Sequence, residues 1–440
     1  MIHLIGSFLE YLIPFIFALG ILIFAHELGH FLVAKRSGIR VEVFSLGYAP
    51  KMLGIRLGET EYRISWIPFG GYVKMAGQSD VGKPEIKGEP WEYPSKPVPV
   101  RMAVIAAGPV MNFLLAFLLF FLLLFVEGVE KFPPVVGVVE EGSLAHRAGF
   151  RAGDRILSVG GAPVDSWDAI AESFFFHEGT LLDFEVEREG ARLHLGAEAN
   201  AENIDFGLYP YVPPVVASVL PNSPAERAGM EQGDAVTSID GEAVHGWEDM
   251  RRQVSTHPGD TLLVSWIRGG VEHQAHIVPT ARKTYNEQNE KIEYGVIGVT
   301  RQAQYERLGL LASLKFGALQ TYAVTGEILG FLRKLLVGRA SPRLLGGPLM
   351  IAELAGESAR VGLRNLFFFI AFLSVNLALV NILPIPALDG GHLLFLTVEG
   401  IVRRPLSLKQ RAIVQQIGLG FLLFTMVYVV INDITRYFGR

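Results

Sequence analysis

The sequence predicts a polytopic α-helical membrane protein whose four transmembrane helices enclose a water-soluble insert. Three observations predict this class. Half of the 440 residues are hydrophobic and only 19% are charged, and the mean hydropathy is +0.34. The apolar residues form long runs toward both ends of the chain, whereas the middle is mixed and charged. Because about 20 consecutive apolar residues can cross a bilayer as a helix, the spans are expected at the two ends.

The predicted spans cover roughly residues 4–33, 102–126, 366–388 and 417–431. The first is not a cleavable signal peptide, because no Lys or Arg precedes it and its apolar run is too long. The segment 35–101 holds eleven Lys or Arg, and the turn between the last two spans adds Arg403, Arg404, Lys409 and Arg411. Positively charged loops stay in the cytoplasm. Both termini and the central region are therefore predicted to lie outside.

The stretch from about residue 308 to 338 is partly apolar but is not predicted to span. It carries Lys315, Gln320, Glu327, Arg333 and Lys334. This mixture favours an amphipathic helix lying on the outer membrane face. A fifth span would also upset the orientation that the loop charges indicate.

Overall charge and cysteine content exclude several classes of function. The net charge is −5, so no basic field points to nucleic acid as a partner. The chain has no cysteine. Disulfides, thiolate metal ligands and a cysteine nucleophile are therefore excluded, and any metal must be held by His, Asp or Glu. The lack of cysteine does not assign a compartment.

The central region contains an internal duplication. Residues 135–169 and 215–249 align without a gap at an offset of 80, and 14 of the 35 positions are identical. Each copy reads Ser-x-Ala-x-x-Ala-Gly and then Gly-Asp, which resembles the core of bacterial PDZ domains. Two inserted PDZ-like α/β domains are therefore predicted. Such modules bind chain ends by adding a strand to a sheet edge; a steric filter or spacer that binds no peptide tightly is the other open reading.

The first span contains the H-E-x-x-H pattern as His26, Glu27 and His30. Helix positions i and i+4 share a face, so two imidazoles can reach one metal, and Glu27 can reach a water beside it. Zinc lowers the pKa of such a water to about 7. A chance match is the alternative, but three ionisable residues in a span are costly and indicate function by default.

A catalytic zinc usually has three protein ligands and one open position, so one ligand is missing. Asp389 fits, because spans one and three run in the same direction and Asp389 is expected at the depth of the two histidines. Pro384 and Pro386 break the helix just before it, which is tolerated only against protein or a water-filled cavity. His392 is the rival ligand but lies nearer the interface. The plain alternative for Asp389 is a turn residue at a helix end.

Two amides, Asn376 and Asn381, lie in the same span. Amides in spans usually join helices by hydrogen bonding, but they can also hold an unwound substrate backbone. The substrate role is favoured for Asn381, which is nearer the proline break.

Taken together, these motifs resemble the site-2 protease family of intramembrane zinc proteases, in particular its bacterial members with tandem PDZ domains. The resemblance covers nearly the whole chain. Its motifs, in order, are AHELGH, PFGGYVKMAG, GPVMNF, the PDZ pair, GGPLMIAELAG and NxxxxNxxPxPxLDGG.

The resemblance implies specific roles. It implies His26, His30 and Asp389 as zinc ligands and Glu27 as the catalytic carboxylate. It further implies that residues 40–75 form a membrane-dipping β-hairpin. An edge strand of such a hairpin can pair with an extended substrate chain. The predicted substrate-binding residues are Asn376, Asn381, Pro384, Pro386, Gly70 and Gly71.

The resemblance also implies the biological setting. Substrates are expected to be single-span membrane proteins already trimmed outside, such as an anti-sigma factor of an envelope stress pathway or remnant signal peptides. The PDZ pair is expected to exclude untrimmed proteins by bulk. The chain is expected in the bacterial inner membrane, with its termini and PDZ domains periplasmic.

The predicted organisation follows. It is a first span (1–34), a cytoplasmic-side loop with the hairpin (35–101), a second span (102–126), two PDZ-like domains (127–212 and 213–303), an amphipathic helix and linker (304–363), a third span (364–392), a cytoplasmic loop (393–412) and a fourth span with the C-terminus (413–440). One alternative is a membrane-anchored PDZ scaffold with an inactive metal site, although a scaffold gains nothing from buried charge. A metal transporter is a poorer alternative, because the chain has no inverted repeat.

Overall fold

A computed structural model describes residues 2–78, 87–167, 169–170, 173, 181–198, 207–285, 291–404 and 408–438. The chain divides into two compact units. Unit 1 comprises Met1–Val126, Glu287–Asn289 and Gly309–Arg440, and unit 2 comprises Glu127–Asn286 and Glu290–Leu308.

Unit 1 is a helical bundle with one β-hairpin. Its helices are α1 (Ile2–Arg36), α2 (Val98–Val126), α7 (Leu310–Leu336), α8 (Pro348–Val361), α9 (Leu363–Ile382), α10 (Asp389–Val402) and α11 (Leu408–Phe438), with 3₁₀ turns at Tyr93–Ser95 and Pro342–Leu344. Over the described residues, four stretches are long and apolar enough to cross a membrane: Leu9–Arg36, Val98–Val126, Leu363–Ile382 and Ile413–Thr435. The four spans predicted from the sequence are confirmed at this level.

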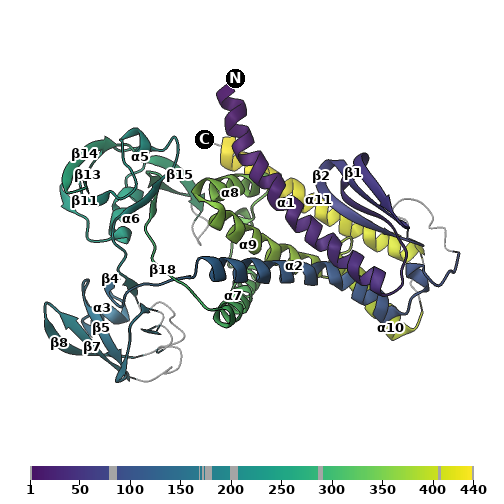
Figure 1. The fold of residues 1–440 in the computed structure, drawn as a ribbon, viewed down its shortest axis with the longest axis horizontal. Helices are drawn as coiled ribbons and strands as arrows, with labels where there is room; N and C mark the ends of the chain where they lie inside the picture. Colours follow the sequence, from purple (N-terminus) through teal and green to yellow (C-terminus); the bar gives the residue numbers. More distant parts are fainter. Residues whose placement is uncertain are drawn as a thin grey trace. The chain divides into compact units, whose positions relative to one another are not determined.

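The arrangement of unit 1 places the hairpin and α10 together. In Figure 1 the two chain termini lie at one end of this unit, and the hairpin and α10 lie at the other. Helix α2 packs against both α1 and α9 and is therefore the central span. Helices suit the interior of a bilayer because they satisfy their own backbone hydrogen bonds where no water is present.

The third span is shorter than predicted. Helix α9 ends at Ile382, and Asp389 begins a separate helix, α10, where the prediction placed the end of span three and then a loop. The two prolines at 384 and 386 cause this difference, because neither can donate a backbone hydrogen bond to continue α9. The apolar run after Asp389 then forms its own helix up to Val402.

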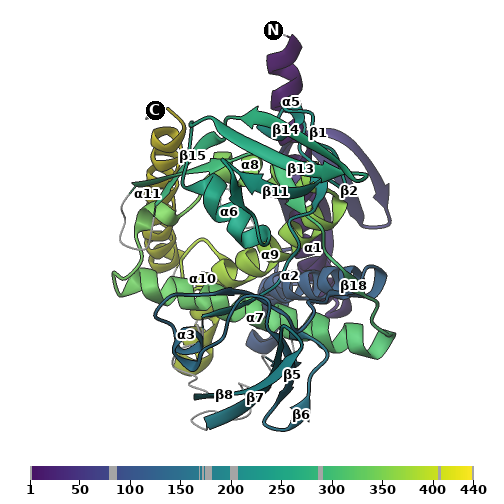
Figure 2. The same ribbon diagram turned by 90° about the vertical axis from the view of Figure 1, so that its left-hand side faces the viewer.

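Helix α7 crosses α2 instead of running beside it. Figure 1 shows α2 along the page and α7 foreshortened, whereas Figure 2 shows the reverse. This helix occupies the stretch predicted to be amphipathic. Several of its apolar side chains are largely exposed, including Leu311, Tyr322 and Leu336.

Helix α8 was not predicted, and it begins on a cap supplied from far along the chain. The side chain of Asp433 in α11 is fully buried and accepts hydrogen bonds from the backbone amides of Gly347, Leu349 and Met350. These amides belong to the first turn of α8, which has no cap of its own. The charged group near the end of the fourth span therefore has a structural role.

The hairpin consists of β1 (Val41–Leu57) and β2 (Thr60–Met75). The segment Val43–Leu46 of β1 pairs with Gly71–Lys74 and also with Glu61–Ile64. Since this segment lies between two parts of β2, the other edge of the last part of β2 pairs with no strand among the described residues and is called the free edge below. The hairpin also exposes large apolar residues: Tyr48, Met52, Leu53, Ile55, Leu57, Ile64, Trp66 and Ile67.

Unit 2 contains two halves whose described elements follow the same order, as the duplication predicts, apart from α6 and the pair β15 and β16 in the second half. The first half has β4 (Val136–Val139), α3 (Leu144–Ala148), β5 (Arg155–Val159), β6 (Ala162–Pro163), β7 (Leu181–Arg188), β8 (Ala191–Glu198) and β9 (Leu208–Pro210). The second half has β10 (Val216–Val219), α5 (Pro224–Arg227), β11 (Ala235–Ile239), β12 (Glu242–Ala243), α6 (Trp247–Ser255), β13 (Leu262–Arg268), β14 (Val271–Ile277), β15 (Thr280–Tyr285), β16 (Lys291–Val296) and β17 (Val299–Arg301).

The sheets of the two halves correspond. The four-stranded orders are β6-β5-β7-β8 and β12-β11-β13-β14, and the two-stranded sheets are β4-β9 and β10-β17. The hairpin β15–β16 of the second half has no counterpart among the described residues of the first half. Each half buries its own apolar core, around Phe184 and Val186 in the first and around Val264 and Trp266 in the second.

Each half also contains the same buried ion pair. Asp154 and Asp234 of the Gly-Asp turns are fully buried, and each receives two hydrogen bonds from an arginine, Arg188 or Arg268. Burial alone would raise the pKa of Asp234, but hydrogen bonds from Arg268 and from the Glu231 amide outweigh it and hold this pKa below its usual value.

The lowered pKa of Asp234 predicts an acid-sensitive second half. A carboxyl whose pKa is lower in the folded state stabilises the fold above its unfolded pKa of about 3.9 and loses this effect as pH falls through its folded value. We expect hydrogen exchange in the full-length protein to show protection of β11 and β13 decreasing below about pH 4. Asp234→Asn should lower their protection at pH 7 by about tenfold or more, since Arg268 loses its charged partner.

The first half is the control for this measurement, because Asp154 and Arg188 remain intact in that variant. Its strands should keep their protection at pH 7. Equal losses in both halves, or none in β11 and β13, would contradict the prediction.

Candidate metal centre

The two histidines and the aspartate predicted as ligands lie together. His26 and His30 project from α1, and Asp389 begins α10. The Asp389 Oδ2 atom lies 3.1 Å from His26 Nε2 and 3.7 Å from His30 Nε2, and the two Nε2 atoms are 3.2 Å apart. Among the described residues, these three form the group that can hold a metal ion, with all ligand atoms within 4.8 Å of one another.

The hydrogen bonding of this cluster fits a cation. His30 Nδ1 lies 2.8 Å from the Val104 carbonyl oxygen, so Nδ1 carries the proton and Nε2 presents a lone pair to the cluster. Asp389 Oδ2 is buried and makes no hydrogen bond of good geometry in the described part of the chain. Nitrogen lone pairs and a carboxylate converge here on one point, which is the donor set that zinc accepts.

Glycines let α1 and α2 approach closely enough to build the cluster. A Cβ atom on Gly108 of α2 would lie 2.4 Å from His30 Nε2 and 2.7 Å from His26 Cε1. A Cβ atom on Gly29 of α1 would lie 2.2 Å from the Ala107 carbonyl oxygen. Side chains at either position would therefore push the helices apart.

The approach to Asp389 is similarly tight. A Cβ atom on Gly390 would lie 2.1 Å from the Leu383 carbonyl oxygen, and one on Gly391 would lie 2.5 Å from that of Ile385. Ala387 has a positive φ of 81°, which is unusual for a residue with a side chain. The two glycines let the proline-containing segment pack against the first turn of α10, where Asp389 begins the helix.

Glu27 lies against the hairpin. A Cβ atom on Gly71 of β2 would lie 3.0 Å from Glu27 Cγ and 2.8 Å from Ile23 Cγ2. Gly70 has a φ of +107°, and a Cβ atom there would lie 2.3 Å from the Tyr48 ring. The Gly-Gly pair therefore brings the last part of β2 next to the carboxylate.

The other predicted site residues are less closely connected to the cluster. Asn376 and Asn381 are partly buried in α9, and Pro384 and Pro386 lie between α9 and α10. Their substrate roles stay a prediction. The rival ligand His392 is not among the residues of the cluster; its ring contacts Phe395.

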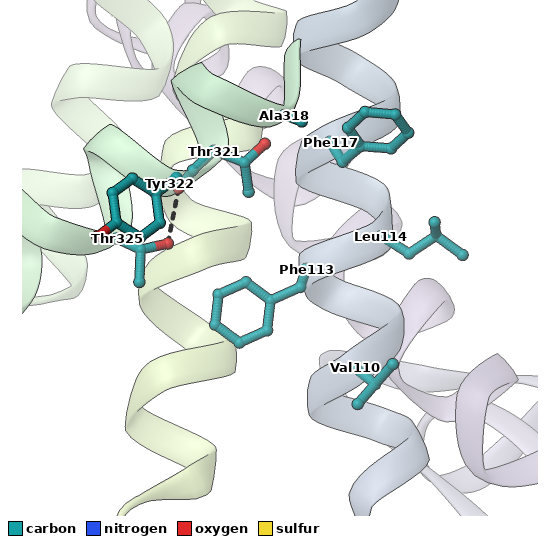
Figure 3. A pocket seen from close by; sticks show the side chains of 8 residues that line it. All are labelled: Val110, Phe113, Leu114, Phe117, Ala318, Thr321, Tyr322 and Thr325. Atoms are coloured by element: carbon teal, nitrogen blue, oxygen red, sulfur yellow. Dashed lines mark hydrogen bonds between the residues drawn. The ribbon is translucent and has the colours of Figure 1, made fainter. Parts of the chain in front are cut away.

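An apolar groove of about 420 Å³ lies between α2 and α7, apart from the cluster. Figure 3 shows the side chains that line it: Val110, Phe113, Leu114, Phe117, Ala318, Thr321, Tyr322 and Thr325. The two threonine hydroxyls of the groove are satisfied within α7, because Thr325 donates to the Thr321 carbonyl oxygen and Thr321 donates to that of Gly317.

Gly29 and Gly108 were not predicted to belong to the site. Their positions could have indicated a role, because both glycines lie in apolar spans. Gly29 lies within the H-E-x-x-H pattern, and Gly108 lies four residues before Asn112. Small residues at helix interfaces allow close packing in membranes. Which helix each one approaches could not be read from the spacing.

A multi-span helical bundle in which two histidines and a carboxylate cluster beside a glutamate is typical of membrane metalloproteases. The chain is a member of Peptidase family M50, whose profile matches residues 14–425. This is the site-2 protease family that the sequence motifs resemble, so that prediction is confirmed.

Curated relatives agree. The regulator of sigma-E protease RseP of Escherichia coli is 34% identical, with 98% of this chain and 99% of that protein covered. Protease RseP of Yersinia pestis is 32% identical over the same shares. A Neisseria meningitidis protein, provisionally named a zinc metalloprotease, is 34% identical over 97% of this chain and 99% of its own. The chain is thus a site-2-type zinc metalloprotease.

Among solved structures, the PDZ domain of an SdrC-like protein from Listeria monocytogenes is 27% identical and covers 21% of this chain and 88% of its own. Its TM-score is 0.17. This value is too low to support an argument about fold.

Proposed function

We propose that this protease cuts peptide bonds within the membrane-spanning segments of single-span proteins that have already been trimmed outside the membrane. In this proposal His26, His30 and Asp389 hold zinc, and Glu27 is the catalytic carboxylate. The convergence of the three ligand atoms in an apolar bundle, with Glu27 next to His26, is the observation that carries it.

The residues divide the chemistry among them. Zinc, when bound, supplies Lewis-acid chemistry that polarises a peptide carbonyl and activates water. Glu27 takes a proton from the attacking water and returns it to the departing amine. The two imidazoles are held close to α2, because Gly108 lies directly against both rings and the Val104 carbonyl oxygen accepts a hydrogen bond from His30 Nδ1.

The hairpin is proposed to present the substrate in extended form. A helical substrate hides its backbone amides, whereas a strand paired to the free edge of β2 exposes the bond to be cut. The position of Gly71 against Glu27 supports this, because a strand added there would run beside the carboxylate. The exposed apolar residues of the hairpin support its insertion into the bilayer. Asn376, Asn381, Pro384 and Pro386 would contact the unwound substrate.

The two halves of unit 2 are proposed to be PDZ-like domains that exclude untrimmed proteins by size. Their equal element order supports a duplicated module. The proposed setting is the bacterial inner membrane, with both termini and unit 2 in the periplasm and α7 on the periplasmic membrane face. The natural substrates would be an anti-sigma factor of an envelope stress pathway and remnant signal peptides.

The test uses two reporters, a trimmed single-span protein and the same protein with its outer domain intact. Wild type should cut only the trimmed reporter. Glu27→Gln should keep zinc yet lose cleavage by at least a hundredfold, since the proton carrier is gone. Full cleavage by this variant would contradict the proposed role of Glu27.

The same assay tests the filter. The strands β3 (Val129–Glu130) and β18 (Tyr305–Glu306) pair with each other, and the Lys131 amide donates to the Gln304 carbonyl oxygen at 2.8 Å. A short linker can therefore replace the residues between them. This shortened protein should cut the untrimmed reporter as well; unchanged selectivity would count against exclusion by size.

A further inference from the structure

We propose that Asn112 of α2 is a positioning residue that orients His26 for metal binding. The inference rests on the proposed zinc site and extends it to α2, which supplies none of the three ligands. The Asn112 side-chain amide would hydrogen-bond to His26 Nδ1, the ring nitrogen that faces away from the metal.

The first observation is the burial of Asn112. Its side chain is fully buried in the second span. Its Nδ2 atom lies 3.3 Å from His26 Nδ1, and its Oδ1 atom makes no hydrogen bond in the described part of the chain. A buried polar group in an apolar bundle is costly unless it is satisfied, so this placement needs a reason.

The second observation is the geometry of α2. Val104, Gly108 and Asn112 follow each other at intervals of four and share one face of the helix. Along this face, the Val104 carbonyl oxygen accepts from His30 Nδ1, Gly108 leaves room for both rings, and Asn112 meets His26 Nδ1. One face of α2 therefore contacts the Nδ1 atoms of both histidines.

The chemistry of an amide explains why asparagine suits this position. A ring that binds metal through Nε2 carries its proton on Nδ1, where it needs an acceptor. Without metal, Nε2 can carry the proton, and Nδ1 then needs a donor. The amide offers a carbonyl oxygen on one side and an amino group on the other, so a half-turn of its plane serves either tautomer. It can therefore stay paired with His26 while metal enters or leaves.

The proposal is separable from simple packing of α2. Ser374 of α9 donates a hydrogen bond to the main-chain oxygen of Asn112 at 2.8 Å. That contact does not involve the amide side chain, and it should survive substitution of Asn112 by leucine, which has a similar volume. Helix packing and ring orientation can thus be changed independently.

The experiment measures zinc affinity of the purified full-length protein by competition with a chelator, which requires no catalysis. Asn112→Leu should weaken zinc binding by about 10- to 100-fold, the usual effect of losing such an outer partner. Asn112→Asp should keep the affinity of wild type or exceed it, because a carboxylate accepts from Nδ1–H. Ser374→Ala should leave the affinity unchanged.

Two results would overturn the inference. One is wild-type affinity in Asn112→Leu. The other is equal loss in Asn112→Leu and Asn112→Asp, which would indicate packing alone. Failure of the underlying zinc site is distinguishable, because His26→Ala would then bind zinc as tightly as wild type.

Discussion

Asp389→Ala should empty the metal centre. Its Oδ2 atom is the only oxygen in the cluster, and the nearest carboxylate on α1, that of Glu27, is proposed for proton transfer. The remaining histidines would bind zinc as a two-ligand site, whereas catalytic zinc usually has three protein ligands. The affinity should therefore fall by more than the roughly 100-fold that the loss of an outer partner costs. Zinc content of the purified protein, measured by elemental analysis, checks this.

His392→Ala is the matched control. His392 lies three residues further along α10 and is not part of the cluster, so its loss should leave nearly full zinc content. Retention of zinc in Asp389→Ala together with loss in His392→Ala would reverse the assignment of the third ligand. The comparison also separates a metal ligand from a turn residue at the start of α10, because a turn residue would change stability without selective loss of zinc.

Gly108→Ala should disrupt the same centre although it replaces none of the three proposed ligands. The added methyl group would lie 2.4 Å from His30 Nε2, well inside van der Waals contact. The His30 ring cannot turn away freely because its Nδ1 is held by Val104. Either the ring leaves its position or α1 and α2 separate, and overpacking of this kind commonly costs about 1–3 kcal/mol. Zinc content and cleavage of the trimmed reporter should both drop by at least tenfold.

Gly20→Ala is the matched control on α1, the helix that carries His26 and His30. No atom lies within 4 Å of a Cβ atom built at Gly20, so the extra methyl group meets open space. This variant should keep zinc and activity, and the helix should gain slightly in stability. Similar behaviour of the two alanine variants would mean that the close approach of α1 and α2 is not required.

The duplication in unit 2 illustrates how far a sequence pattern reaches. Its 35 aligned positions predicted two copies of one module, and the two halves do share their element order. The aligned positions ended before Arg188 and Arg268, although the same offset of 80 relates them. Their pairing with Asp154 and Asp234 became visible only when the strands were in place. The two partners of each salt bridge are 34 residues apart, and a single pair at that separation produces no periodic pattern in the sequence.

The third span illustrates the opposite limit. The prolines correctly predicted a break before Asp389, but not that a new helix would start at that residue. Whether chain after a break forms loop or helix depends on what it packs against. Here Gly390 and Gly391 fit against the carbonyl groups of the preceding segment, which a pattern of prolines and glycines cannot specify.

The sequence alone determined what is local: four apolar spans, two imidazoles at i and i+4 on one helix, and a repeat at fixed offset. Such features follow from helix periodicity and composition. The tertiary structure alone decided how Asp389 approaches α1 from 359 residues beyond His30, which glycines make room for the rings, and that Asn112 and Gly71 lie beside His26 and Glu27. These contacts depend on how α1, α2, α10 and the hairpin pack, and packing between distant segments is not encoded in any single periodicity.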